Sequence, residues 1–194
     1  MDRKEFLKGL VTACCGAAAC IHPAFASLQE KKKNNSPETP CDEKVKFTKD
    51  WIKRFMDILD DNLDEKTRRR IMEANGKACY LSHPKEPRKE KMSPEVFVKE
   101  MAKYVGKENC YKDGNNIYFR YTENPNGLKV SDGYCLCPMV EDGPENLSPT
   151  YCYCSVGYVS EMMNYYIGSP VKVELLESLR TGGKSCRFVI NLKI

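Results

Sequence analysis

Four cysteines in two C-x-C pairs are the residues of this sequence whose types and spacing are best suited to chemistry. Cys135 and Cys137 form the first pair, Cys152 and Cys154 form the second, and fourteen residues lie between them. Four thiolates can surround one soft metal ion, as they do in structural zinc sites and iron–sulfur clusters. The spacing therefore predicts a four-cysteine metal site that holds zinc or an iron–sulfur cluster.

Disulfides, free thiols and a redox-active dithiol are also compatible with the same pattern. Eight of the eleven cysteines lie beyond the predicted N-terminal signal, and eight cysteines in an exported protein also suit a disulfide framework. A redox-active dithiol is a third reading, although the sequence has no C-x-x-C motif in a thioredoxin-like context. The cysteines that can substitute as metal ligands are Cys79, Cys110 and Cys186.

Cys154 is the candidate nucleophile if the protein is an enzyme. A helix that begins at Ser155 would place the Cys154 thiolate near the positive end of the helix dipole, which favours the ionised form. A helix that begins at Ser148-Pro149 is the competing prediction, and Ser155 is preferred. His83 is the one histidine beyond the signal and lies in a proline-rich loop, so no general base is evident.

An apolar pattern of helical period runs from Val156 to Ile167, between the second cysteine pair and Cys186. Tyr158 and Met162 on this helix are candidates to line a pocket for a flat or apolar small molecule, with ordinary core packing as the alternative. Together with Cys186, they form the predicted ligand-binding set.

The first 26 residues resemble an export signal of the twin-arginine type. The sequence Arg3-Lys4-Glu5-Phe6-Leu7 precedes a moderately apolar run, and Ala24-Phe25-Ala26 offers a cleavage site. A lipid anchor at Cys14 is the alternative. Residues 27–43 are polar and predict a disordered linker. The protein is therefore expected outside the cytoplasm, in the periplasm or cell envelope, with membrane contact only through its signal.

Residues 44–194 predict one α+β domain. The helical part, residues 44–106, carries apolar residues at helical spacing around Trp51, which is expected in the core. In residues 107–194 the apolar period changes from near 3.6 to 2, which predicts an antiparallel sheet packed on one long helix in the order β-β-β-α-β-β. The predicted strands include a short one at Gly133–Cys137.

The charge pattern gives no sign of a nucleic-acid partner. The net charge of +4 is modest, and no arginine-rich stripe is interleaved with aromatic residues. The partner expected from the candidate pocket is a small molecule.

Several motifs in the last third of the chain carry a family resemblance. They are Gly157-Tyr158, Gly168-Ser169-Pro170-Val171, Glu174 and Gly182-Gly183-Lys184-Ser185-Cys186-Arg187-Phe188. This region resembles the 4-vinyl-reductase-type small-molecule-binding domain, and in particular bacterial sequences described as L-2-amino-thiazoline-4-carboxylate hydrolase-like.

The resemblance implies a ligand pocket between helix and sheet, in some members with a cysteine-bound metal. Cys186 matches the cysteine that precedes the last strand in that superfamily, whereas Ser178 or Leu179 stands where a partner cysteine is frequent. The resemblance also implies the alternative function, hydrolysis of a small cyclic amidine or thiazoline by Cys154 or by a metal-bound water.

Overall fold

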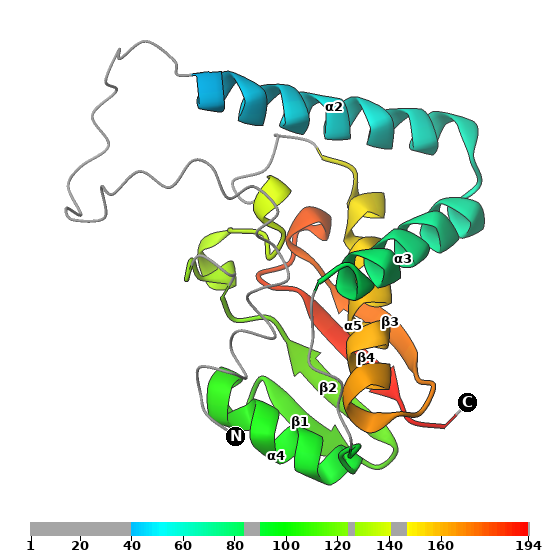
Figure 1. Cartoon of the computed structure of the whole chain (residues 1–194), viewed down its shortest axis with the longest axis vertical. Coiled ribbons are helices and arrows are strands. Elements are labelled where there is room, and N and C mark those ends of the chain that lie inside the picture. Colours follow the sequence, from blue (N-terminus) through cyan, green and yellow to red (C-terminus); the bar gives the residue numbers. More distant parts are fainter. Residues whose placement is uncertain (1–39, 84–89, 124–126, 141–146, 194) are drawn as a thin grey trace, which may run out of the picture.

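The computed structural model describes residues 40–83, 90–123, 127–140 and 147–193 (Figure 1). The predicted signal and residues 27–39 of the predicted linker lie outside these ranges. The helices are α2 (Pro40–Asn62), α3 (Glu65–Leu81), α4 (Pro94–Val105) and α5 (Tyr153–Ile167). The strands are β1 (Cys110–Asp113), β2 (Asn116–Arg120), β3 (Lys172–Glu177) and β4 (Arg187–Asn191).

The four strands form one antiparallel sheet in the order β1-β2-β4-β3. The α+β class is confirmed, with helices first and the sheet after them. The predicted extra strand at Gly133–Cys137 is wrong. Gly133 closes a 3-10 turn with φ of 93°, and Pro138 opens another turn, so this segment runs irregularly beside the sheet.

The main core lies between the sheet and the helices. The strand residues that alternate inward include Ile117, Phe119, Phe188 and Ile190, each at most 3 % exposed. Helices α4 and α5 pack against them (Figure 1), because each presents an apolar stripe of helical period. Ser93 caps α4 and Gly106 ends it, as the sequence predicts.

Helix α3 crosses α5 at unusually close range because both helices carry a glycine at the crossing. A Cβ atom on Gly76 would lie 1.8 Å from the carbonyl oxygen of Cys154, and one on Gly157 would lie 1.8 Å from that of Glu73. The two glycines thus let the backbones meet directly. This contact fixes the start of α5 against α3.

Helix α2 lies across the end of α3 and α5 (Figure 1) and differs most from the predictions. It begins at Pro40, inside the predicted linker, and Thr48 lies within it. Trp51 is 50 % exposed, so its predicted core position is wrong. The buried contact of α2 is instead made by Ile52, which follows Trp51 directly, and by Met56 and Leu59 on the same side of the helix. None of the described helices is long and apolar enough to cross a membrane.

Candidate thiol site

The two C-x-C pairs come together beside the start of α5. Cys135 and Cys137 lie in the irregular segment between the 3-10 turns Val130–Asp132 and Pro138–Val140. Cys152 ends the 3-10 turn Pro149–Cys152, and Cys154 follows in the first turn of α5.

The start of α5 corrects the preferred prediction. Ser155 does not cap the helix, because helical structure begins earlier, with Ser148 accepting a hydrogen bond from the backbone N–H of Thr150. Ser148-Pro149 combines an N-cap side chain with a proline in the first turn, where the missing N–H costs nothing. The change from a 3-10 turn to an α-helix falls between Cys152 and Cys154.

The four thiols are electrostatic neighbours in a closed ring, which we call the thiol ring. Cys135 neighbours both Cys137 and Cys152, and Cys154 neighbours both Cys137 and Cys152, since charge on one sulfur raises the pKa of the next. These electrostatic interactions join the first members of the two C-x-C pairs to each other and the second members to each other. The fold therefore brings the two pairs within electrostatic range of each other.

Two further cysteines extend the thiol ring. Cys186 interacts in the same way with Cys152 and Cys135, and Cys79 of α3 interacts with Cys154. These are two of the three predicted substitute ligands. The third, Cys110, lies on β1, and only burial shifts its pKa. All seven cysteines whose side chains the structure describes are present as thiols.

Burial is the main influence on the acidity of the ring. It raises the pKa of Cys137 and Cys152, and it raises the pKa of Cys154 to about 12. At neutral pH a thiol with that pKa is almost wholly protonated, whereas the thiolate is the nucleophile. The geometry therefore speaks against Cys154 as an unassisted catalytic nucleophile, despite its place in the first turn of α5.

Polar groups surround the sulfurs and donate hydrogen bonds to them. Arg180 Nη2 donates to Cys135 Sγ at 3.3 Å, and Asn75 Nδ2 donates to Cys154 Sγ at 3.5 Å. Tyr151 Oη lies 3.3 Å from Cys137 Sγ. Such donors stabilise sulfur that carries negative charge.

Arg180 is the most informative of these groups. Its Nε is buried and has no hydrogen-bond partner in the described part of the chain, and its positive charge lowers the pKa of Cys152. A buried guanidinium is costly unless negative charge lies nearby. Its charge therefore offsets part of the effect that burial has on the pKa of Cys152. Arg180, Asn75 and Tyr151 could not be found from spacing, because each lies far in sequence from the sulfur that it contacts.

The thiol ring rests on a small second hydrophobic cluster. We call this the α2 cluster; its buried members are Ile52, Met56, Leu59, Met72, Val140 and Leu147. Cys135, Cys137 and Cys154 pack against it.

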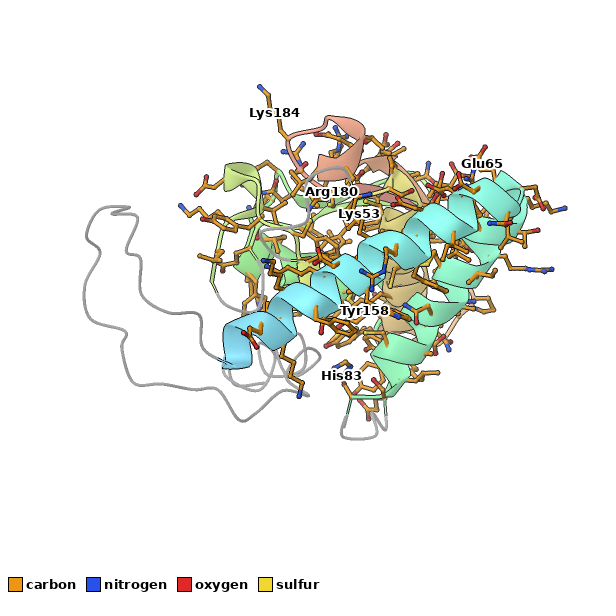
Figure 2. All side chains as sticks on the ribbon, turned by 90° about the horizontal axis from the view of Figure 1, so that it is seen from above. Lys53, Glu65, His83, Tyr158, Arg180 and Lys184 are labelled. Carbon is orange, nitrogen blue, oxygen red and sulfur yellow. The ribbon has the colours of Figure 1, made fainter. Side chains whose placement is uncertain are left out.

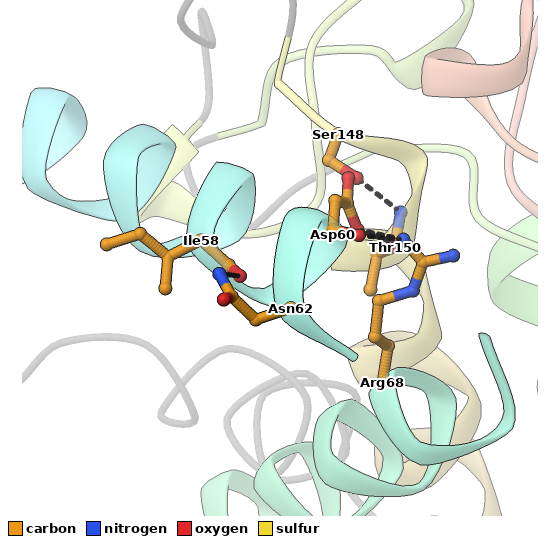
Figure 3. A network of polar contacts seen from close by, with 6 residues as sticks. All are labelled: Ile58, Asp60, Asn62, Arg68, Ser148 and Thr150. Carbon is orange, nitrogen blue, oxygen red and sulfur yellow. Dashed lines mark hydrogen bonds and ion pairs between the residues drawn. The ribbon is translucent and has the colours of Figure 1, made fainter. Parts of the chain in front are cut away.

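A polar network supports the α2 cluster (Figure 3). Arg68 Nη1 contacts Asp60 Oδ1 at 2.9 Å, and Thr150 Oγ1 donates to the same oxygen at 2.8 Å. The network joins α2, α3 and the turn that carries Cys152.

The three predicted ligand-binding residues lie in different environments. Met162 is 2 % exposed and belongs to the main core. Tyr158 is half-buried, and its ring meets that of Tyr80 edge-on at 5.0 Å. Cys186 is buried next to the thiol ring. His83 Nδ1 donates to the carbonyl oxygen of Cys79 at 2.6 Å, so its described contact is with backbone.

The positions of the sulfurs do not amount to a preformed coordination sphere. Among the described residues, no group of three or more histidine, cysteine, aspartate or glutamate side chains is arranged so that it could hold a metal ion. Metal binding at the thiol ring therefore requires the side chains to move from these positions.

Comparison with known proteins places the chain in a family. Residues 33–194 match the model of DUF6144, described as a family of unknown function. The match covers most of the chain, which therefore belongs to this family, and it includes every residue of the thiol ring. Comparison with curated proteins finds no match.

Proposed function

We propose that this member of the DUF6144 family is an exported binding protein whose thiol ring holds a soft metal, as zinc or as an iron–sulfur cluster. The observation that supports the proposal most directly is the ring itself. Cys135, Cys137, Cys152 and Cys154 come from two separate segments, and each thiol is within electrostatic range of two others. Ordinary packing does not require four thiols at one place.

The protonated state of the buried thiols supports the proposal, because a bound soft cation would ionise them. Burial keeps Cys137, Cys152 and Cys154 protonated. A bound soft cation deprotonates its thiol ligands and offsets the unfavourable burial of their charge. Arg180 and Asn75 already donate to two of the sulfurs, as partners of metal-bound thiolates do.

The movement that binding requires is local. Cys135 and Cys137 lie in a segment outside helix and strand, so rotation of their side chains breaks no ladder or helix hydrogen bond. Cys152 and Cys154 are held by α5 and its preceding turn. We expect the first pair to close onto the second when a metal binds.

Hydrolysis of a cyclic amidine or thiazoline, the alternative function, is not carried forward as a proposal. The pKa of Cys154, about 12, makes its thiol a poor nucleophile at neutral pH. Export and the small-molecule ligand stay predictions from the sequence.

The test is the metal content of protein purified without oxygen, with an absorption spectrum and a cobalt titration of the metal-free protein. We expect one zinc ion or one cluster per chain. A visible charge-transfer band identifies iron–sulfur, and tetrahedral cobalt bands with thiolate charge transfer identify a zinc-type site.

Matched variants decide where the metal sits. Cys137→Ser and Cys154→Ser should abolish stoichiometric binding, whereas Cys110→Ser, a buried thiol outside the ring, should retain it. A chain that takes up neither metal nor cobalt while its thiols stay reduced would overturn the proposal. If Cys110→Ser lost as much metal binding as the two ring variants, the metal could not be assigned to the thiol ring.

A further inference from the structure

Helix α2 carries a second apolar face that points away from the molecule. Phe47, Trp51, Phe55 and Ile58 are 65, 50, 39 and 57 % exposed, and we call this face the α2 stripe. The Trp51 and Phe55 rings stack with their centroids 5.3 Å apart. Figure 2 looks onto α2, which lies across the outside of the domain. Large exposed apolar patches mark interaction sites.

The α2 stripe is separate from the buried side of the helix. Each of the inward residues Ile52, Met56 and Leu59 follows a stripe residue by one position, so it lies about 100° further round the helix. The packing of α2 on the described part of its domain therefore leaves the stripe exposed. It is also separate from the thiol ring, so the inference does not depend on the proposed function.

We infer that the α2 stripe pairs with the same stripe of a second copy of this chain, with the two helices antiparallel. A two-fold axis between residues 52 and 53 would set Phe47 of one copy opposite Ile58 of the other. The same axis sets Trp51 against the Arg54-Phe55 turn of the other copy. The stripe is thus complementary to itself, as an isologous interface requires.

The charges beside the α2 stripe fit the same arrangement. Lys44 and Lys46 are exposed near the start of the helix, and Asp61 is exposed near its end. Antiparallel pairing about this axis sets Lys44 beside Asp61 of the second copy, whereas parallel pairing sets like charges together. The opposite ends of α2 therefore select one orientation.

Other occupants fit the observations less well. An anionic membrane surface would attract Lys44 and Lys46 but repel Asp50 and Asp61, which are exposed on the same helix. The apolar run in residues 9–19 lies outside the family match, whereas α2 lies inside it. A cover from that run would not belong to the shared domain.

The first experiment is sedimentation velocity on the purified full chain over a range of concentrations. We expect a dimer that Trp51→Glu weakens by roughly tenfold or more, as for a central aromatic residue of an interface. Leu81→Glu changes another exposed apolar residue, 65 % exposed on α3, and should leave the dimer intact. Circular dichroism checks that both variants are folded.

The second experiment is zero-length carbodiimide crosslinking followed by mass spectrometry. Lys44 and Asp61 are about 25 Å apart on one straight helix, so a link between them can form only between two copies. We expect this link in the wild-type chain and its loss in Trp51→Glu. A monomer at every concentration, a dimer unaffected by Trp51→Glu, or a monomer that binds anionic vesicles would overturn the inference.

Discussion

The main core and the α2 cluster are built in different ways. Eighteen buried residues of the described chain form the main core, drawn from all four strands or their edges and from α3, α4 and α5. The α2 cluster has six, and cysteine and tyrosine side chains fill its borders. Because the hydrophobic contribution scales with buried apolar area, the main core contributes more to the free energy of unfolding than the α2 cluster does.

The α2 cluster depends on contacts of another kind. Its members come from α2, from α3 through Met72, and from 3-10 turns and irregular segments, tied by the Asp60–Arg68–Thr150 network and by the thiol ring. Polar and sulfur contacts are directional and are lost one at a time. The candidate site therefore lies in the part of the molecule where apolar packing contributes least to stability.

The largest expected effect comes from opening the main core. Phe188→Ala removes a fully buried ring at the centre of the sheet and should lower the free energy of unfolding by about 3–5 kcal/mol. All regions should lose hydrogen-exchange protection together. Met56→Ala in the α2 cluster should instead release α2 and leave the sheet amides protected. If both variants lost exchange protection equally across the whole protein, the two clusters would not be separate.

The glycine crossing joins the two regions and should give the next largest effect. Gly157→Ala sets a methyl group against the Glu73 carbonyl and should destabilise the protein by about 1–3 kcal/mol. In an unobstructed helix the same change stabilises by about 1 kcal/mol, so the sign is diagnostic. Lys77→Ala, exposed on α3, is the control in urea unfolding and should have little effect.

Alkaline pH should lower the free energy of unfolding of the metal-free protein, because its buried thiols resist ionisation. Burial raises the pKa of Cys154 from its ordinary 9.0 to about 12. The unfolded chain therefore loses this proton first, and stability present below pH 9 falls by about 1.4 kcal/mol per pH unit as the pH rises towards 12.

Urea unfolding with a chelator between pH 8 and 11 measures this slope. Cys154→Ala should reduce it by the contribution of one thiol, since other titrating groups are the same in both proteins. A bound metal should reverse the trend below pH 9, because metal and protons compete for sulfur. An unchanged slope in Cys154→Ala would show that this thiol does not titrate as a buried group.

The smallest expected effect concerns the network under the α2 cluster. Thr150→Val removes the hydrogen bond to Asp60 and should cost about 1 kcal/mol, mainly as lost exchange protection near the end of α2. Thr48→Val removes a hydroxyl that donates to the Lys44 carbonyl of its own helix, a contact within one element, and it should be nearly neutral. Equal effects would mean that the network does not join the elements.

Local patterns were sufficient for much of the fold. Ser93-Pro94 and Gly106 bound α4, and the alternation through Phe188 and Ile190 marks β4, because caps and periodicity act over a few residues. The same reasoning failed at Gly133–Cys137, where alternation over five residues could not show that none of the described strands pairs with this segment.

Periodicity could not predict which residues of α2 are buried. Its apolar residues cover a wider arc than one contact can bury, so the pattern could not say whether Trp51 or Ile52 faces the core. Gly76 is a similar case. A glycine inside a helix pattern by itself indicates only a weak point of the helix, whereas the structure uses Gly76 for close contact with α5.

The sequence by itself determined the types of the chemical groups and their spacing: two C-x-C pairs, a helix after the second, and an antiparallel sheet, since each depends on neighbours along the chain. Only the folded structure brings the two pairs within electrostatic range of each other, buries Cys137, Cys152 and Cys154 so that the pKa of each thiol rises, and sets Arg180 and Asn75 in contact with sulfurs. Those properties depend on which distant segments exclude water from one another, and no local pattern encodes that exclusion.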